Sequence, residues 1–189
     1  MFDQLFFLGL ALLIFWAMIP NKSKRPRKKA SLHRRNIKQS QAMLAEIQQC
    51  KGRNRGQSIF YLLRYHLSPY EFEELLLTCL ESYGVTIQRS RSYSGDGGVD
   101  GTFRYKSKTY AIQAKRYRSH INPKHVKEFS SLIANSSFSG GLFIHCGKTG
   151  GLSKVKKGTH ISIVSGSLLI EFLELTASID RLLPQPINQ

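Results

Sequence analysis

The sequence predicts an α/β domain in which helices flank a small β-sheet, with a separate apolar segment at the N-terminus. Three stretches favour this fold class: an amphipathic helix beginning at Ser68, two short strands within residues 99–117, and a second helix beginning after Asn122-Pro123. Apolar residues recur at roughly 3.6 residues in a helix and at 2 in a strand, so their spacing assigns each stretch.

The first helix carries a clear start signal. Ser68 is suited to the N-cap, Pro69 to the first helical position, and Glu71 to closing a capping box. Gly84 is a good terminator. Between them, apolar residues at helical spacing predict a face that packs on the core: Phe72, Leu75, Leu76, Cys79 and Leu80.

Two glutamates of this helix are expected to differ. At about 100° per residue, Glu73 falls at the flank of the apolar face, beside Leu76 and Leu80, whereas Glu74 is expected to point to solvent. A carboxylate at the edge of a core face can look into a cleft. A solvated glutamate at the boundary would fit the same position.

The two strands are expected to form a hairpin. Residues 99–105 are rich in β-formers, and residues 109–117 alternate in character after a polar break. Because side chains alternate between the faces of a strand, Gln113 and Lys115 share one face. Asp100 opens the first strand, and the hairpin can bring it opposite the end of the second.

An acid, an amide and an amine therefore converge at one end of the hairpin. Such a set can bind a divalent metal beside a phosphate and cut a phosphodiester. The glycines within residues 95–101 free the backbone to bend tightly or to approach a ligand closely. The same residues also fit an ordinary Asp-Gly turn beside a hydrated strand face, so the spacing alone leaves both interpretations open.

The chain resembles the catalytic domain of Mrr-type restriction endonucleases, a branch of the PD-(D/E)XK nuclease superfamily. Three segments carry the resemblance: Phe72-Glu73, the glycine-rich stretch 95–101, and Gln113-Ala114-Lys115-Arg116-Tyr117. It extends over roughly residues 68–175, where 141–145 looks like the family's next core strand, and 161–164 followed by Leu168-Leu169 looks like its last strand and helix. The resemblance implies a restriction-endonuclease-like core, a mixed β-sheet flanked by helices.

The resemblance also implies a catalytic site. Asp100 would be the main metal ligand, Gln113 would take the place of the second acid, Lys115 would be the catalytic lysine, and Glu73 would complete the site. The expected cofactor is Mg²⁺, with Asp100, Gln113 and Glu73 as its ligands. Gln113 departs from the commonest superfamily pattern but is typical of the Mrr branch. Its amide oxygen carries no charge, so Glu73 would supply the missing one. Asp96 would shape the loop or assist the metal indirectly.

The charge of the chain favours a polyanionic partner. Its 189 residues include 28 Lys and Arg against 12 Asp and Glu, a formal net charge of +16, and residues 101–127 contain no acid. Phosphate contacts dominate nucleic-acid affinity, so double-stranded DNA is the expected partner. The candidate contacts are Arg104, Arg116, Arg118, Lys124 and Lys127. A basic surface that only promotes solubility is the alternative.

The N-terminus is expected to be a membrane anchor. Residues 2–19 are almost wholly apolar, close to the roughly 17 to 25 residues that a spanning helix needs. The basic run 22–29 follows, and by the positive-inside tendency it stays cytoplasmic. A cleaved signal peptide is the alternative, but it would carry its positive charge before the apolar run. The expected location is thus the inner (cell) membrane, single-pass, with the nuclease domain in the cytoplasm.

Four segments are expected: a transmembrane helix at 1–20, a basic and partly helical linker at 21–56, a restriction-endonuclease-like domain at 57–180, and a tail at 181–189. Short helices are expected at 40–49, with Leu44 and Ile47 on a thin apolar stripe, and at 57–65.

The expected function is that of a membrane-anchored, Mg²⁺-dependent DNA endonuclease similar to type IV, Mrr-like restriction enzymes. Two alternatives stay open: a nuclease for DNA processing or transfer at the membrane, and a non-catalytic DNA-binding module with the nuclease fold. With one site per chain, cutting both strands would require a homodimer or successive nicks.

Overall fold

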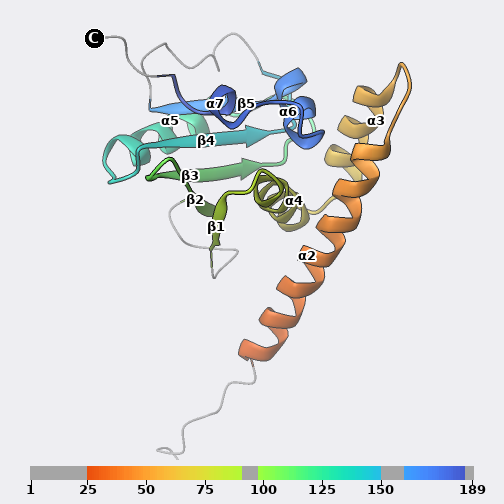
Figure 1. Cartoon of the computed structure of the whole chain (residues 1–189), viewed down its shortest axis with the longest axis horizontal. Coiled ribbons are helices and arrows are strands. Elements are labelled where there is room, and N and C mark those ends of the chain that lie inside the picture. Colours follow the sequence, from red (N-terminus) through yellow and green to blue (C-terminus); the bar gives the residue numbers. More distant parts are fainter. Residues whose placement is uncertain (1–24, 91–97, 150–159, 186–189) are drawn as a thin grey trace, which may run out of the picture. The chain divides into compact units, whose positions relative to one another are not determined.

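The structure is a computed structural model that describes residues 25–90, 98–149 and 160–185 (Figure 1). The expected membrane helix at 1–20 lies outside the described residues, as does Asp96. Within the described ranges, no helix combines the length and apolar character that crossing a membrane requires. The chain forms two compact units, Met1–Arg34 and Arg35–Gln189, and the second contains the whole sheet.

A five-stranded mixed sheet is the centre of this second unit, in the order β1-β2-β3-β4-β5 (Figure 1). β1, β2 and β3 pair antiparallel, whereas β3, β4 and β5 pair parallel. The strands are β1 Thr86–Arg89, β2 Gly101–Tyr105, β3 Lys108–Lys115, β4 Gly140–His145 and β5 Ile161–Val164. The mixed sheet confirms the expected α/β class.

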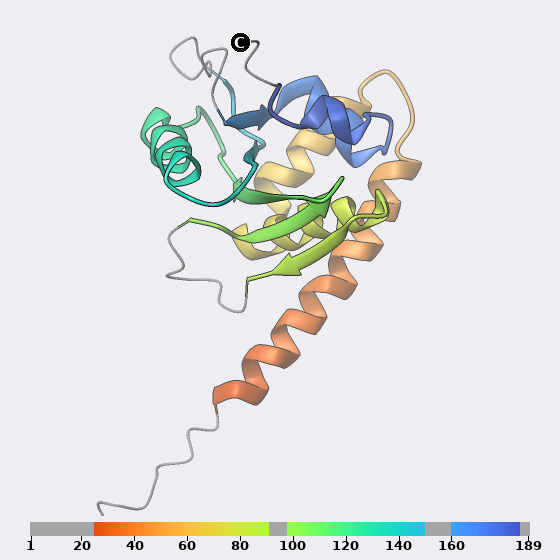
Figure 2. The same cartoon turned by 60° about the vertical axis from the view of Figure 1, so that its left-hand side comes forward.

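Helices lie on both faces of this sheet. The helices of the described residues are α2 Arg25–Gln49, α3 Arg55–Tyr61, α4 Pro69–Ser82, α5 Pro123–Ala134, α6 Gly166–Leu173 and α7 Ile179–Leu182, with a π-helix η1 at Leu62–His66. Ile112 and Ala114 of β3 join the core cluster that contains α4, while Ala111 joins the cluster that contains α5. Neighbouring residues of one strand point to opposite faces, so α4 and α5 cover opposite faces, and they stand apart in Figure 2.

The compact unit begins earlier than residue 57. Leu44 and Ile47, near the end of α2, are 5% and 2% exposed and belong to the same core cluster as the sheet. Ile59 and Leu63 extend that cluster from α3 and η1. Residues from Arg35 onward therefore belong to the same compact unit as the sheet. Residues 35–56, which were expected to be part of the linker, lie within this unit.

The start of α4 confirms the capping prediction. The Glu71 backbone N–H donates to Ser68 Oγ at 3.2 Å, and the Ser68 N–H donates to Glu71 Oε2 at 2.8 Å. The predicted apolar face is fully buried: Phe72, Leu75, Leu76, Cys79 and Leu80.

The prediction that Glu74 points to solvent is wrong. Glu74 is 1% exposed, and Arg89 of β1 donates to its Oε2 at 2.9 Å. β1 was not predicted, so the sequence offered no partner for this carboxylate. Arg89 also contacts Glu81, and together these ion pairs link α4 to the edge of the sheet.

The predicted hairpin is confirmed, with ends that differ by a few residues. β2 and β3 pair from Gly101↔Ile112 to Tyr105↔Lys108. Lys106 and Ser107 form the turn with φ of 47° and 63°, the combination that suits the twist of a two-residue hairpin.

Candidate active site

Asp100 is held at the end of the hairpin by three hydrogen bonds with backbone groups, one of which runs from the Ser90 N–H to its carbonyl at 3.1 Å. The Asp100 N–H donates to Ile112 O at 2.8 Å, and the Ala114 N–H donates to Asp100 Oδ2 at 2.7 Å. The carboxylate is therefore fixed against the stretch of β3 that contains Gln113 and Lys115. This is the convergence that the hairpin predicted.

Gln113 lies deep in this site. It is 6% exposed, and within the described part of the chain its Oε1 is buried without a hydrogen-bond partner. On the other side of the amide, Gly98 comes so close that an added Cβ would lie 2.5 Å from Gln113 Nε2. Gly98 also has a φ of +94°, so glycine is needed here both for space and for backbone conformation.

Glu73 of α4 and Lys115 of β3 complete the cluster. Both side chains are partly buried. Burial raises the pKa of Glu73 to about 8, with a further upward push from the negative charge of Asp100, while the Lys115 ammonium acts in the opposite direction. Burial also raises the pKa of Asp100, and the Ala114 N–H and Lys115 oppose that rise. The three groups thus share one electrostatic environment.

This set of donors fits a hard divalent cation. Burial disfavours both carboxylates as anions, and the charge of Asp100 further disfavours that of Glu73, so a cation between them would stabilise both charges. It would also give the Gln113 Oε1 the partner it lacks among the described residues. Oxygen ligands suit Mg²⁺, which keeps several waters and needs few protein groups. The described residues contain no cluster of three or more His, Cys, Asp or Glu that could hold a metal.

Sequence reasoning missed a group of residues behind Lys115. His145 pairs in register with Lys115 across the parallel strands and is fully buried. Burial and the positive charge of Arg64 lower its pKa to about 4, so the ring is neutral at pH 7. The Arg64 Nε donates to Cys146 O at 2.7 Å, and Arg116 Nη1 donates to Arg64 O. Arg64 precedes α4 and had no sequence signal that linked it to the site.

The five candidate DNA contacts differ in exposure: four are exposed and Arg116 is not. Arg118, Lys124 and Lys127 are exposed, and Lys124 lies 3.8 Å from Glu128. Arg116 is adjacent to Lys115, but it is partly buried and bonded to a backbone carbonyl.

Arg104 is not brought to the catalytic cluster. It pairs in register with Thr109, six residues before Lys115, which is about 20 Å along the strand.

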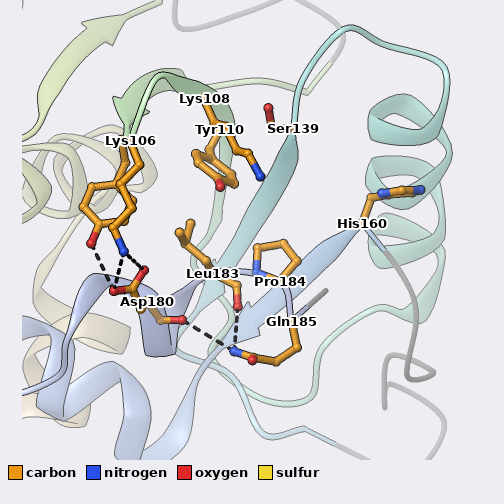
Figure 3. A pocket seen from close by; sticks show the side chains of 10 residues that line it. Lys106, Lys108, Tyr110, Ser139, His160, Asp180, Leu183, Pro184 and Gln185 are labelled. Atoms are coloured by element: carbon orange, nitrogen blue, oxygen red, sulfur yellow. Dashed lines mark hydrogen bonds and ion pairs between the residues drawn. The ribbon is translucent and has the colours of Figure 1, made fainter. Parts of the chain in front are cut away.

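A hollow of about 550 Å³ lies at the other end of the hairpin (Figure 3). Lys106 Nζ, at its rim, forms an ion pair with Asp180 at 3.0 Å, and Tyr105 Oη also donates to that carboxylate. Lys106 belongs to the β2–β3 turn, whereas Asp100 and Lys115 lie at the opposite ends of these strands. This hollow is therefore separate from the candidate site.

Comparison with known proteins identifies the family of this chain. The family model of the Mrr catalytic domain, described as a restriction endonuclease, matches residues 64–173, which is more than half of the chain. Comparison with curated proteins gives no match.

Among solved structures, the MspJI restriction endonuclease in complex with a 27-mer oligonucleotide is similar, with 18% sequence identity and a TM-score of 0.47. The match covers 71% of this chain and 36% of the MspJI chain, so this chain spans little more than a third of that enzyme. From the family match, the chain belongs to the Mrr-type restriction endonuclease catalytic-domain family.

Proposed function

We propose that this protein is a Mg²⁺-dependent DNA endonuclease that hydrolyses phosphodiester bonds, similar to type IV, Mrr-like restriction enzymes. The observation that supports it most is the hydrogen bond from the Ala114 N–H to Asp100 Oδ2. It holds a carboxylate beside Gln113 and Lys115, where Glu73 adds a second acid. Membership of the restriction endonuclease family supports the same reaction.

In this proposal, Asp100, Glu73 and the Gln113 amide oxygen would hold Mg²⁺. The bound metal would polarise a phosphoryl oxygen and lower the pKa of a water molecule. Lys115 stabilises the negative charge that grows on the phosphate oxygens as the bond to water forms. Exposed Arg118, as well as basic residues at the start of α5, bind the backbone of double-stranded DNA.

Cleavage of duplex DNA by the full chain with Mg²⁺ tests the proposal. Lys115→Ala should lower the rate by about 10²–10³, the cost of removing one preorganised group that stabilises developing charge. Lys108→Ala is the matched control because Lys108 is an exposed lysine at the other end of the same strand. Equal rates for the two variants would defeat the assignment of Lys115.

Asp100→Asn separates charge from structure. Asparagine keeps an oxygen that can accept the Ala114 N–H, so the fold should persist while metal-dependent cutting is lost. Calorimetric titration of Mg²⁺ into parent and variant gives a readout independent of cleavage. Undiminished Mg²⁺ binding by Asp100→Asn would remove Asp100 from the ligand set.

A role in DNA processing or transfer at a membrane is the second candidate. It rests on the uncharged apolar stretch 5–19 followed by the basic run 22–29, a pattern typical of a single-pass anchor in the cell membrane with a cytoplasmic domain behind it. Fractionation of cells that express a reporter fused to residues 1–30 tests the anchor, and a wholly soluble fusion would exclude it.

Substrate choice separates the remaining candidates. Cutting restricted to methylated duplexes supports restriction, and preference for branched duplexes supports processing. Binding without cutting supports a non-catalytic DNA-binding module. The time course on supercoiled plasmid addresses oligomeric state, since a homodimer would linearise the circle directly and a monomer would accumulate the nicked form first.

A further inference from the structure

The α3–η1 segment presents a cluster of aromatic rings to solvent. Tyr61 is 59% exposed and Tyr65 is 54% exposed. The Tyr61 ring centroid lies 5.2 Å from that of Tyr65 and 5.1 Å from that of His66. The π-helical turn accounts for this geometry: its hydrogen bonds join residues five apart, so the fourth and fifth residues after Tyr61 both lie beside it, with their ring planes tilted from that of Tyr61 by 41° and 58°. We call Tyr61, Tyr65 and His66 the ring surface.

In the sequence around the ring surface, every Lys, Arg, Asp or Glu is a Lys or an Arg. Residues 47–70 contain no Asp or Glu but include Lys51, Arg53, Arg55 and Arg64. Several of these residues line a groove of about 860 Å³ together with Tyr61 and Tyr65.

Acidic residues of the facing wall are already paired. Glu174 lies 2.9 Å from Arg55 Nε, and Glu171 pairs with Arg181. Among the ion pairs of the described residues, none involves Arg53 or Arg64. The groove thus offers unpaired positive charge beside exposed rings.

Arg64 connects this groove to the candidate active site. Its side chain donates to Cys146 O just beyond β4, and its carbonyl accepts from Arg116, the residue after Lys115. The guanidinium also lies 4.8 Å from the centre of the Phe60 ring in the groove. A DNA strand that leaves the cut site next to Lys115 would meet the ring surface within a few nucleotides.

We propose that the ring surface binds unpaired nucleotides of the DNA strand next to the cut site, so that the preferred substrate carries a single-stranded tail or gap. This inference rests on the proposed function and specifies its substrate. Rings stack on the faces of bases, which are covered in a duplex and open in a single strand. Exposed tyrosines flanked by arginines supply the combination of stacking and backbone attraction that such a strand requires.

Fluorescence anisotropy of the full chain without divalent metal, which prevents cutting, tests this inference. The probes are a blunt duplex and the same duplex with a single-stranded thymidine tail. The parent should bind the tailed duplex at least about tenfold more tightly, the gain expected from one or two stacked bases. The double variant Tyr61→Ala/Tyr65→Ala should lose that preference and keep its affinity for the blunt duplex.

Two further variants separate stacking from other effects. Tyr61→Phe/Tyr65→Phe keeps both rings and should keep the preference. Tyr70→Ala removes an exposed tyrosine, 42% exposed, that is not part of the ring surface, and should also keep it.

Three results would overturn the inference. Equal affinity of the parent for blunt and tailed duplexes would do so while leaving the proposed function intact. If Tyr70→Ala lost the preference for tailed DNA as fully as the double alanine variant, that preference would not come specifically from the ring surface. Alanine variants that bind tailed DNA normally but lose binding to vesicles of anionic lipid would identify a membrane contact instead. Failure of the parent to bind either duplex would count against the proposed function itself.

Discussion

Gly98→Ala should disable the site more than it destabilises the fold. A Cβ at Gly98 would lie 2.5 Å from Gln113 Nε2, whereas Cβ contacts under 3.0 Å are essentially never seen. The Gln113 amide must therefore retreat by about half an ångström or more. Because a misplacement of about 1 Å can cost a hundredfold in rate, we expect cleavage to fall by about tenfold to a hundredfold.

Gly84→Ala is the matched control for this variant. Gly84 has a φ of +77°, close to the +94° of Gly98, but a Cβ there would meet nothing within 4 Å. Both variants place alanine in a left-handed conformation, which costs about 1–2 kcal/mol of folding stability. The loss of cleavage in Gly98→Ala beyond that in Gly84→Ala therefore measures the effect of displacing Gln113.

The assay combines urea unfolding with single-turnover cleavage of duplex DNA at saturating protein and Mg²⁺. We expect similar losses in the free energy of unfolding, and a loss of cleavage confined to Gly98→Ala. If both variants cut at the parental rate, the position of the Gln113 amide has no part in catalysis, and its role as a metal ligand would have to be abandoned.

Three further predictions concern stability, each measured by urea unfolding. Arg89→Met removes a partner of the Glu74 carboxylate, whose side chain is 2% exposed, and should lower the free energy of unfolding by about 3–5 kcal/mol. Glu81→Gln changes a side chain that is 40% exposed and should lower it by less than about 1 kcal/mol. Equal losses would show that burial does not decide the effect. His145 has a pKa of about 4 in the folded protein, below its ordinary value of 6.5. The neutral buried ring therefore contributes fully to folding stability above pH 6.5, and roughly 3 kcal/mol of that stability should be lost as the pH falls toward 4. A His145→Gln variant whose free energy of unfolding has the same pH dependence as the parent would contradict this. Ile47→Ala should cost about 2–5 kcal/mol because Ile47 is 2% exposed in the core, and a fragment from residue 57 should accordingly be less stable than one from residue 35; equal stability of the two fragments would show that α2 adds nothing.

Local signals in the sequence predicted the elements that bear the candidate site. The capping residues from Ser68 to Glu71 fixed the start of α4, and alternation fixed which residues of β3 share a face. Both signals depend only on residues a few positions apart, so they can be read from the sequence without knowledge of the fold.

What the sequence missed depends on contacts between distant segments. β1 has only four residues, Thr86–Arg89, none of them buried, so its apolar pattern is weak. Glu74 is buried only because this strand supplies Arg89. Residues 62–66 form a π-helical turn, whose period differs from that of an α-helix. The contact of Arg64 with Cys146 at the end of β4 therefore could not be predicted from α-helical spacing.

The hydrogen bond from the Ala114 N–H to the Asp100 carboxylate lies within a single hairpin, but the second carboxylate comes from α4, which precedes that hairpin in the chain. During synthesis, Glu73 leaves the ribosome first and has no partner until the hairpin has formed and α4 has docked on it. On the proposed assignment, a growing or partly folded chain cannot cut the DNA of the cell that makes it. On that assignment, activity arises together with the packed core, and variants that loosen α4 should lower cleavage before they lower expression.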